Sequence, residues 1–426
     1  MALNELRKLK VKTSELNYHC KLLIKGVEVD NKTIISLAIK ESVFYVPRLD
    51  LIINDNGLFT DLVPLEDDDE ITVEISKSNK QDAVITSLKF RLLDFEFQNT
   101  GGSNLSSYGL HISALYDLPI YFPLKNKSFP KKTSVDVLKE LGNEYGLTVN
   151  SYITSNDIMT WLQINQKDND FINNVLKNSY ISEDDFLIAY FDRNNSMNIT
   201  SILTELKQKD AFVCSYDEKK FLDKEPDLKE DTTTPKDNDL IKLYYGDIQI
   251  TSVAGIINKM SGGYSYLLNW YENNGVETKA TITNKQHELT QLTWKNKKNI
   301  KEITAQSNFG YLSGNVHSNW FKAMIINKTL KDMYFSFALT MPINPNDKIQ
   351  LLDKGFVKVP NNVKYSVDEQ NINVYNENYS GTYFIGELTH TLVFNGGGNY
   401  GMKATMFRNG LNKNGFMEDS EWSVSE

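Results

Sequence analysis

The sequence predicts a β-rich α+β protein with more than one domain. Segments that alternate apolar and polar residues recur along the chain, and helical patterns are few and lie away from its ends. With 426 residues the chain is longer than an ordinary domain of roughly 100–200 residues, so two to four domains are expected. A hydrophobic content of 40% and a charged content of 24% exclude a disordered or collagen-like chain.

The first part of the chain is predicted to be β-structure. Residues 18–24 and 33–38 are rich in strand-forming residues, and residues 71–75 alternate apolar and polar with period two. Residues 84–97 contain two short apolar runs with branched and aromatic side chains. Alternation of this kind buries one face of each strand.

A helix is predicted from about residue 133. The apolar residues Val135, Leu138 and Leu141 share one face at helical spacing. Thr133 or Ser134 can cap the beginning of this helix, and Gly142 or Gly146 can end it.

The middle of the chain continues as mixed α and β structure. A strand is predicted at 147–149, and a second helix begins near residue 170 and runs to about 176. Residues 186–191 form a strongly apolar strand, and the turn 192–195 leads to another strand at 197–200.

A charged stretch over residues 217–239 is predicted to be a linker or long loop, since it contains two prolines and few apolar residues. Strands resume at 241–245. Ser318 can cap a helix that runs to about Asp332, with Phe321, Met324 and Ile325 on one core-facing side.

The last third is predicted to be strands joined by tight loops. A strand at 334–339 is followed by a tight loop at 341–347 and a strand at 348–352. Residues 383–393 and 402–407 close the pattern as a hairpin. The residues after Gly410 are predicted to be a polar tail.

The charge balance disfavours a dedicated nucleic-acid binder. The chain has 46 Lys and Arg against 55 Asp and Glu, a formal charge of −9, and a pI near 5.3. The one basic stretch, residues 279–301, carries six Lys and one acid, Glu288. A nucleic-acid groove and a solvated strand face both fit this stretch, and the solvated face is the preferred interpretation.

Eight acids and no Lys or Arg lie between Asp55 and Glu74, with a core at residues 66–70. A cation site formed by clustered carboxylates and a solvated turn both fit, and the turn is preferred. The run lacks the alternating oxygen ligands and the sixth-position Gly of an EF-hand loop.

The two cysteines, Cys20 and Cys214, are too few for a disulfide framework. Both lie in apolar, strand-like segments, so buried thiols and a reducing folding compartment are expected. The first twelve residues lack the apolar core of a secretory signal, and no run of about 18 apolar residues predicts a membrane-spanning helix.

No catalytic, cofactor-binding or metal-ligating residue is predicted, because each motif that resembles a site is incomplete. Gly396–Gly401 fits G-x-G-x-x-G, but a strand-like segment follows it, so a hairpin tip is preferred over a dinucleotide site. His287-Glu288 lacks the second His of a zinc motif, since residue 291 is Gln. His390 is expected to be structural, and the carboxylates at 183–185 are expected to be exposed at a turn rather than a glycosidase pair.

The order of the elements resembles a known family. The helix TSVDVLKELGNEYGL is followed by LQINQKDNDFINNVLK, the strand pair DFLIAYFDRNNSMNIT, the phrase PINPNDKIQLL and the closing hairpin GTYFIGELTHTLVFNGGGNYGMKATMFRNGL. This order is similar to that of the central hub protein of contractile-phage baseplates and of the N-terminal part of the type VI secretion spike protein. The family's Pro-Gly-Asp phrase reads Pro345-Asn346-Asp347 here, and Asn tolerates a left-handed turn as Gly does.

The resemblance covers residues 33–411, except for 226–235 and 357–380, which look like insertions. It implies two tail-tube-like β-barrels with an interposed α+β module. Three copies would form a ring that adapts a sixfold tail tube to a threefold spike. The implied location is the tail baseplate of a virion, after synthesis in the host cytoplasm. No enzyme activity and no cofactor are implied.

The implied partners are two further copies of the chain, the tail tube protein, the central spike protein and other baseplate proteins. DNA would be only passing cargo, which the acidic balance would repel from a channel wall. The alternatives are another tail-tip or distal tail component with a receptor- or carbohydrate-binding role, and a cell-wall hydrolase.

The expected division of the chain follows from the same pattern. The first barrel is expected at residues 1–125, the α+β module at 126–210 and a charged linker at 211–240. Residues 241–332 would complete the module and begin the second barrel, which continues over 333–412 and is followed by a polar tail at 413–426.

Overall fold

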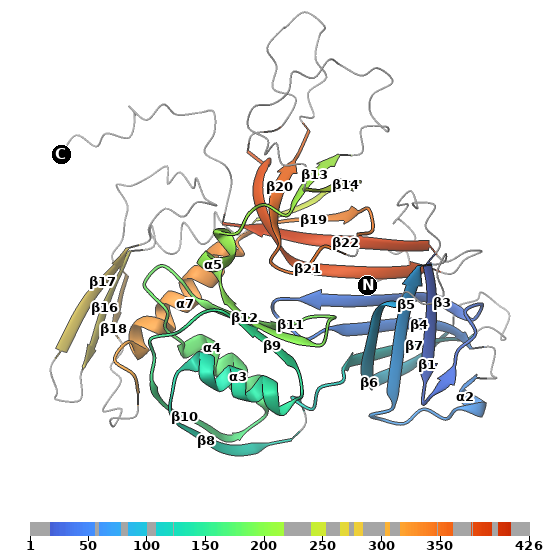
Figure 1. The fold of residues 1–426 in the computed structure, drawn as a ribbon, viewed down its shortest axis with the longest axis horizontal. Coiled ribbons are helices and arrows are strands. Elements are labelled where there is room, and N and C mark those ends of the chain that lie inside the picture. The colour runs from blue at the N-terminus through green and yellow to red at the C-terminus, as the bar shows by residue number, and fades with distance from the viewer. Residues whose placement is uncertain are drawn as a thin grey trace, which may run out of the picture.

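The fold is described from a computed structural model of the chain. The structure describes residues 18–55, 59–77, 84–99, 108–121, 123–216, 240–252, 265–271, 277–283, 303–306, 316–346, 348–360, 376, 378–393 and 399–409. Strands dominate, and the longer helices lie together beside the large sheet (Figure 1), which confirms the β-rich α+β fold class. None of the helices within these ranges has the length and apolar character needed to cross a bilayer.

The first strand unit is an antiparallel sheet of six strands in the order β3-β4-β7-β6-β5-β1. The short β2 pairs with the outer side of β1, and within the described residues no ladder joins β1 to β3. Its strands are β1 (Tyr18–Ile24), β2 (Val27–Glu28), β3 (Ile34–Ser42), β4 (Arg48–Asp55), β5 (Glu70–Lys77), β6 (Val84–Asn99) and β7 (Tyr108–Tyr116), with the short helix α2 (Phe59–Leu62) after β4.

The predicted strands of this unit are confirmed at 18–24, 33–38 and 71–75. The two apolar runs at 84–97 form one strand, β6, whose pairing with β7 shifts register between Leu92 and Asp94. A β-bulge explains how one long strand contains two separate apolar patterns, because the extra residue resets which side chains face inward.

The α+β module follows the first strand unit. Two helices lie side by side against a two-stranded ribbon of β8 and β10 and a three-stranded sheet in the order β11-β12-β9 (Figure 1). Its elements are β8 (Lys125–Lys132), α3 (Ser134–Glu144), β9 (Thr148–Ser151), β10 (Met159–Gln166), α4 (Asp168–Asn178), β11 (Leu187–Phe191), β12 (Ser196–Ser201) and α5 (Ile202–Leu206).

The cap predicted for α3 is confirmed at Thr133. The Thr133 side chain accepts a hydrogen bond from the backbone N–H of Asp136, and the Asp136 carboxylate accepts one from the backbone N–H of Thr133. This reciprocal pair satisfies two N–H groups that a helix N-terminus otherwise leaves without partners. The helix ends at Glu144, with Tyr145 as its C-cap, and Gly146 follows with a φ of 67°.

The second strand unit is a closed barrel of six strands, in the order β13-β14-β19-β22-β21-β20 and back to β13. These strands are β13 (Phe212–Tyr216), β14 (Ile241–Tyr245), β19 (Phe337–Ile343), β20 (Lys354–Lys358), β21 (Gly381–Val393) and β22 (Asn399–Arg408), with β15 (Gln249–Ser252) added to the edge of β19 and helix α7 (Trp320–Tyr334) before it. A separate sheet contains β16 (Ser265–Tyr271), β17 (Glu277–Thr283) and β18 (Ile303–Gln306).

Three predicted boundaries in this unit are wrong. Helix α7 extends through Tyr334, so the strand begins at Phe337 and continues to Ile343, inside the predicted tight loop. On one side of β19, the pairing with β15 ends at Thr340 and the single pair with β14 lies at Ile343. Pro342 lies between these two pairings, where a proline, which has no N–H to donate to a ladder, is tolerated.

The predicted strand at 348–352 is a turn, and the strand β20 begins at Lys354 instead. Leu352 adopts a φ of 66°, a conformation that an L-residue in a strand does not take. Asn346, expected to tolerate a left-handed turn, has no positive φ; its side chain instead accepts a hydrogen bond from the backbone N–H of Lys348 at 2.9 Å.

The two strand units form one continuous sheet. Strand β3 of the first unit pairs with β21 of the second over seven residue pairs, from Glu387↔Ser42 to Val393↔Ser36. Along the same edge, β21 pairs with β20 up to Phe384, so Gly386 lies where β21 passes from one partner to the other. A Cβ atom at Gly386 would lie 2.4 Å from the Phe407 ring, so this position requires glycine.

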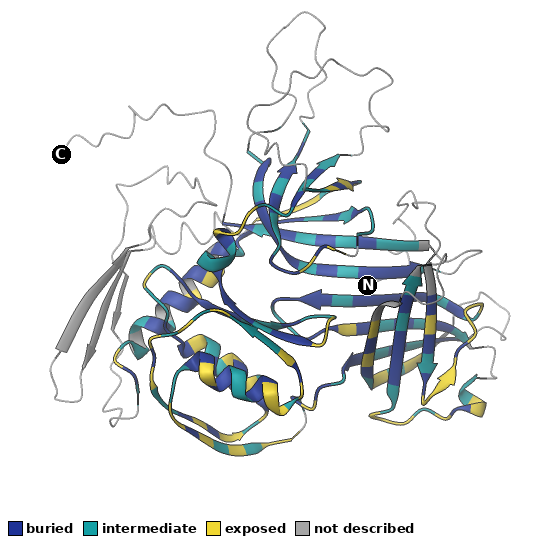
Figure 2. Cartoon of the chain, viewed as in Figure 1, coloured by how far each residue is buried: buried dark blue, intermediate teal, exposed yellow. Residues whose placement is uncertain are grey.

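Buried residues line the inner faces of both strand units and the facing sides of the module's helices (Figure 2). The core of the first strand unit continues into the module through Phe129, Trp161 and Phe171. Trp161 also lies 6.1 Å from Trp320 of α7, measured between ring centroids, so the module packs against the helix that precedes the second barrel.

The linker predicted at 217–239, most of the basic stretch at 279–301, the Gly-rich segment at 396–398, His287-Glu288 and the polar tail lie outside the described residues.

Candidate functional site

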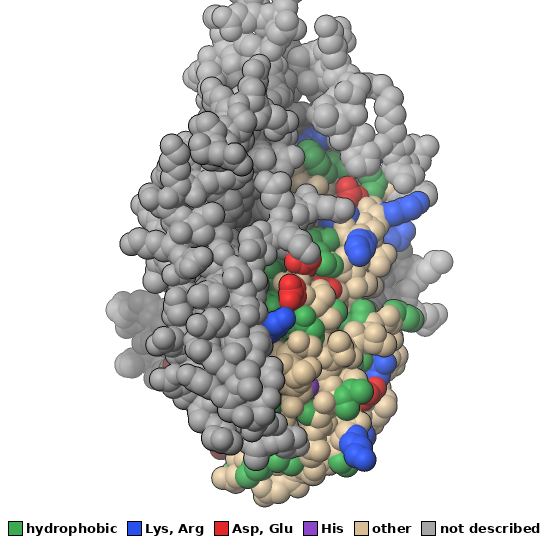
Figure 3. All heavy atoms as spheres, turned by 90° about the vertical axis from the view of Figure 1, so that its left-hand side faces the viewer, with side chains coloured by type: hydrophobic (Ala, Val, Ile, Leu, Met, Phe, Trp, Pro, Cys, Tyr) green, Lys and Arg blue, Asp and Glu red, His purple; other side chains and the backbone are tan. Residues whose placement is uncertain are grey.

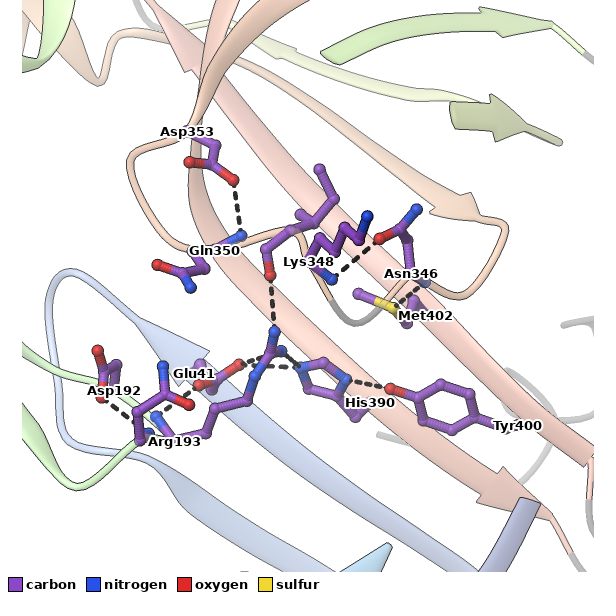
Figure 4. A network of polar contacts seen from close by, with 12 residues as sticks. Glu41, Asp192, Arg193, Asn346, Lys348, Gln350, Asp353, His390, Tyr400 and Met402 are labelled. Carbon is purple, nitrogen blue, oxygen red and sulfur yellow. Dashed lines mark hydrogen bonds and ion pairs between the residues drawn. The ribbon is translucent and has the colours of Figure 1, made fainter. Parts of the chain in front are cut away.

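A buried polar cluster lies where the two strand units and the α+β module meet. We call Glu41, Arg193, His390 and Tyr400 the polar junction (Figure 4). Glu41 lies on β3 of the first unit, Arg193 lies in the turn between β11 and β12, and His390 and Tyr400 lie on β21 and β22 of the second unit.

Backbone pairing positions these side chains. In the β3–β21 ladder Glu41 is the partner of Leu388, two residues from His390, so both side chains point to the same face of the sheet. The turn that carries Arg193 is shaped by Asp192, whose carboxylate accepts hydrogen bonds from the backbone N–H groups of Asn194 at 2.8 Å and Ser196 at 3.2 Å.

The contacts of the junction are short and connect all three parts. The Arg193 backbone N–H donates to Glu41 Oε1 at 3.0 Å, and Arg193 Nη1 lies 3.3 Å from Glu41 Oε2. His390 Nε2 lies 2.9 Å from Glu41 Oε2, and His390 Nδ1 lies 2.6 Å from the Tyr400 hydroxyl. Arg193 Nη2 donates to the carbonyl of Ile349 at 2.8 Å, which ties the loop before β20 to the same cluster.

One ring nitrogen of His390 has a hydrogen-bond acceptor and a hydrogen-bond donor as neighbours. Its Nε2 lies near Glu41, whose carboxylate only accepts, and also 3.0 Å from Arg193 Nη1, which only donates. An imidazole that donates from Nε2 to Glu41 leaves Nδ1 facing the Tyr400 hydroxyl, which can either donate or accept. Contacts at both ring nitrogens therefore fix the orientation of the His390 ring.

Glu41 is held ionised in spite of its burial. Removal from water alone would raise its pKa, but the hydrogen bond with His390 and the nearby charges of His390 and Arg193 outweigh that effect and hold the pKa below its usual value. The side chains of Glu41, His390 and Arg193 are only 3%, 5% and 9% exposed. A substrate cannot reach groups buried to this degree, so the geometry suits a structural connection rather than acid–base chemistry.

Two further contacts extend the connection. The Tyr116 hydroxyl at the end of β7 donates to Asn195 Oδ1 at 2.8 Å, which ties the first strand unit to the β11–β12 turn. The Tyr190 hydroxyl on β11 donates to the carbonyl of Leu351 at 3.4 Å, near the loop before β20. Buried polar contacts of this kind specify one relative arrangement of the packed parts.

The sequence identified His390 as a structural residue but not its partners. Glu41 is separated from Arg193 by 152 positions and from His390 by 349 positions, so no local pattern connects them. The strand IISLAIKES gave only a weak signal, because Glu41 stands beside Lys40 and Ser42 at its polar end. Only the structure shows that this carboxylate is 2% exposed and therefore needs a partner.

The carboxylates at 183–185 do not all lie on the surface, and the prediction is wrong for Asp185. Asp185 is buried, and its Oδ1 accepts hydrogen bonds from the backbone N–H groups of Phe186 at 2.9 Å and Leu203 at 3.1 Å. It therefore connects the beginning of β11 to α5 instead of forming a catalytic pair with a neighbouring acid.

The acidic run at 66–70 has cationic side chains of the protein beside it. Lys25 Nζ lies 3.2 Å from Asp69 and 3.5 Å from Glu66, and Arg91 lies 3.9 Å from Glu70. Within the described residues, no group of three or more His, Cys, Asp or Glu is arranged to hold a metal ion. The described part of the face in Figure 3 has basic, acidic and apolar side chains interspersed.

Both cysteines are buried free thiols, as predicted. Burial raises the pKa of Cys20 to about 12 and raises that of Cys214 as well, so neither thiol is a ready nucleophile. Cys214 lies inside the second barrel beside Met341, with 3.9 Å between the two sulfur atoms.

No family model and no curated protein matches the chain. Solved structures do match it. The tail protein from Neisseria meningitidis MC58 matches at 9% identity with a TM-score of 0.51, covering 92% of this chain and 97% of that one. The prophage MuSo2 43 kDa tail protein from Shewanella oneidensis matches at 10% identity with a TM-score of 0.53, covering 92% and 98%. The chain therefore has, over nearly its whole length, the fold of these two tail proteins.

Proposed function

We propose that the chain is the central hub of a contractile-tail baseplate, a homotrimeric ring between a sixfold tail tube and a threefold spike. The observation that carries the proposal is the fusion of two six-stranded units into one sheet through β3 and β21. Three copies of such a chain would present six strand units around one axis, and cyclic symmetry lets one kind of chain build such a ring. The match to two tail proteins supports this location in a virion.

The edges of the sheet support ring closure. The strand order begins at β15 and ends at β2, and every residue of both strands is exposed. Unpaired edges invite association with other strands, and pairing between copies would remove them. In this proposal β15 of one copy lies against the first strand unit of the next copy. The division of the chain into domains remains a prediction.

The same proposal assigns a structural role and no catalysis. Its support is the burial of the polar junction, which connects the parts of the chain but excludes a substrate. The proposed partners are the tail tube protein, the spike protein and other baseplate proteins, with DNA as passing cargo.

The test is the solution mass of the purified chain, followed by mixing with the tube and spike proteins. A trimer has a mass of about 3 × 48.8, or 146 kDa, and electron microscopy should show a threefold ring of six similar lobes. A chain that stays monomeric at high concentration and binds neither partner would contradict the proposal. Binding to sugars by such a monomer would favour a receptor-binding tail component, and release of fragments from peptidoglycan would favour a hydrolase.

A further inference from the structure

An apolar cavity of about 260 Å³ lies between the α+β module and helix α7. Its walls come from β11, from the end of α4, from one side of α7 and from the segment that follows β3. Val43, Phe186 and Ile188 are buried at its base, and Phe44 and Phe335 are half-buried beside them. A pocket with apolar walls and a few polar groups at its mouth is typical of a binding site.

The rim of the cavity is basic. Lys177 of α4 and Lys328 and Lys331 of α7 are exposed, against one rim acid, Asp332. None of these three lysines forms an ion pair with another described residue. The Lys331 ammonium lies 5.3 Å from the centroid of the Phe44 ring, and the apolar surroundings lower the pKa of Lys331 in spite of the nearby Asp332. A carboxylate that entered the rim would find three ammonium groups that form no ion pair with a described residue.

The last strand of the fold ends beside this cavity. The ring of Phe407 on β22 lies 5.1 Å from that of Phe335 and 5.9 Å from that of Phe44, measured between centroids. The described residues end two positions later, at Asn409. The chain that follows is thus attached next to the two aromatic side chains that line the cavity.

The sequence of that following segment complements the cavity. Residues 416–422 read FMEDSEW, with three carboxylates and no Lys or Arg between Phe416 and Trp422. Phe416 lies seven positions after Asn409, and an extended chain of seven residue steps reaches about 24 Å. The segment offers large apolar side chains for the apolar walls and carboxylates for the three rim lysines.

We propose that this cavity binds residues 416–422 of the same chain, with an aromatic side chain between Phe44 and Phe335 and the carboxylates at the lysine rim. Attachment of the segment beside the site raises its effective concentration to the order of millimolar, so even a weak intrinsic affinity keeps the cavity occupied.

The test is a photo-crosslinking experiment on the full chain. A benzoylphenylalanine in place of Asn173, which lines the cavity and is exposed, should crosslink to residues 411–426. The same residue in place of Ile164, exposed on the outer face of the β8–β10 ribbon, should not. A mixture of ¹⁵N-labelled and unlabelled chains distinguishes crosslinks within one chain from crosslinks between two copies. Both peptides of a crosslink within one chain carry the same isotope, whereas a crosslink between copies can join a labelled peptide to an unlabelled one.

Charge reversal tests the rim. Lys177→Glu, Lys328→Glu and Lys331→Glu together should reduce the crosslink yield about tenfold, as expected for the loss of three surface ion pairs. The matched control reverses Lys209, Lys242 and Lys348, which are exposed elsewhere, and should leave the yield unchanged. Any of three outcomes would overturn the proposal. They are crosslinks to segments other than 411–426 alone, crosslinks between two copies alone, and equal crosslink yields in the two triple variants.

Discussion

The residues of the polar junction contribute to stability because each one satisfies another that is buried. Removal of Glu41 leaves the Arg193 guanidinium without its carboxylate and His390 without its Nε2 partner. Glu41→Ala should therefore lower the free energy of unfolding by about 3–5 kcal/mol, the usual cost of breaking a buried pair. Glu41→Gln, which keeps a hydrogen-bond acceptor, should cost less. Urea unfolding followed by tryptophan fluorescence measures both, and equal stability of Glu41→Ala and the native chain would contradict this assignment.

The same carboxylate predicts an acid sensitivity. The folded chain holds the pKa of Glu41 below the value near 4.5 that applies when the chain is unfolded. The unfolded state therefore takes up a proton first as the pH falls, and the stabilisation present above pH 4.5 is lost below it. Glu41→Gln should flatten this part of the stability profile.

Asp353 behaves in the opposite sense. Burial raises its pKa to about 6, while an unfolded Asp titrates near 3.8, so the folded state keeps the proton longer and stability falls as the pH rises from about 4 to 6. Asp353→Asn removes the charge and keeps an oxygen that can accept from the backbone N–H of Gln350. We expect this variant to be more stable than the native chain by about 3 kcal/mol at pH 8 and equal to it below pH 4, because each pKa unit between 3.8 and about 6 corresponds to about 1.4 kcal/mol. Denaturant titrations at the two pH values measure the difference; a variant that is less stable at pH 8 would show that the carboxylate is needed in its charged form.

At the scale of elements, β21 is the strand on which the architecture depends. It contributes to both strand units, and at Gly386 the Phe407 ring fills the space that a side chain would need. Gly386→Ala should lower stability by about 1–3 kcal/mol, the usual cost of overpacking. Gly246→Ala is the matched control, because its Cβ would lie 3.5 Å from Pro342, an ordinary contact. Thermal unfolding of both variants, and of the double variant with Phe407→Leu, separates the clash from a general effect of alanine.

Elements governed by local chemistry could be predicted from the sequence. Helix α3 has its cap, its apolar face and its ending glycine within fourteen consecutive positions, and the structure agrees at each of them. The strand predicted at 348–352 was wrong because apolar residues in a short run do not distinguish a strand from a buried turn. Ile349, Leu351 and Leu352 are buried there, but as a turn whose carbonyls serve Arg193 and Tyr190.

At the scale of the whole molecule, the sequence predicted strand-rich parts around an α+β module but not how they join. The pairing of β3 with β21 connects residues about 350 positions apart, and a strand's own pattern shows which face is buried but not which strand lies beside it. The polar junction depends on that pairing, which is why only His390 drew notice in the sequence. The inclusion of β13 and β14 in the closed barrel likewise follows from long-range pairing with β20 and β19.

The proposed ring predicts an effect of the edge strand on assembly. Ile250 on β15 is 41% exposed at the free edge of the sheet. Ile250→Lys should shift the solution mass from about 146 kDa toward that of a single chain, since a charge on an edge opposes strand pairing. Ile164→Lys, at 65% exposure on the β8–β10 ribbon, serves as the control and should leave the mass unchanged. Light scattering measures both, with circular dichroism as the check on folding; equal masses would place the contact elsewhere.

The continuous sheet also has a mechanical consequence. Strands β3 and β21 are joined along their lengths by seven residue pairs. A force that pulls the two strand units apart along the strand direction would load all of these hydrogen bonds at once, whereas a force across the strands would open them one after another. The molecule should therefore resist a force along the strands more strongly than a force across them. A force applied along the strands to one unit is transmitted to the other, and the two units move together as one rigid body.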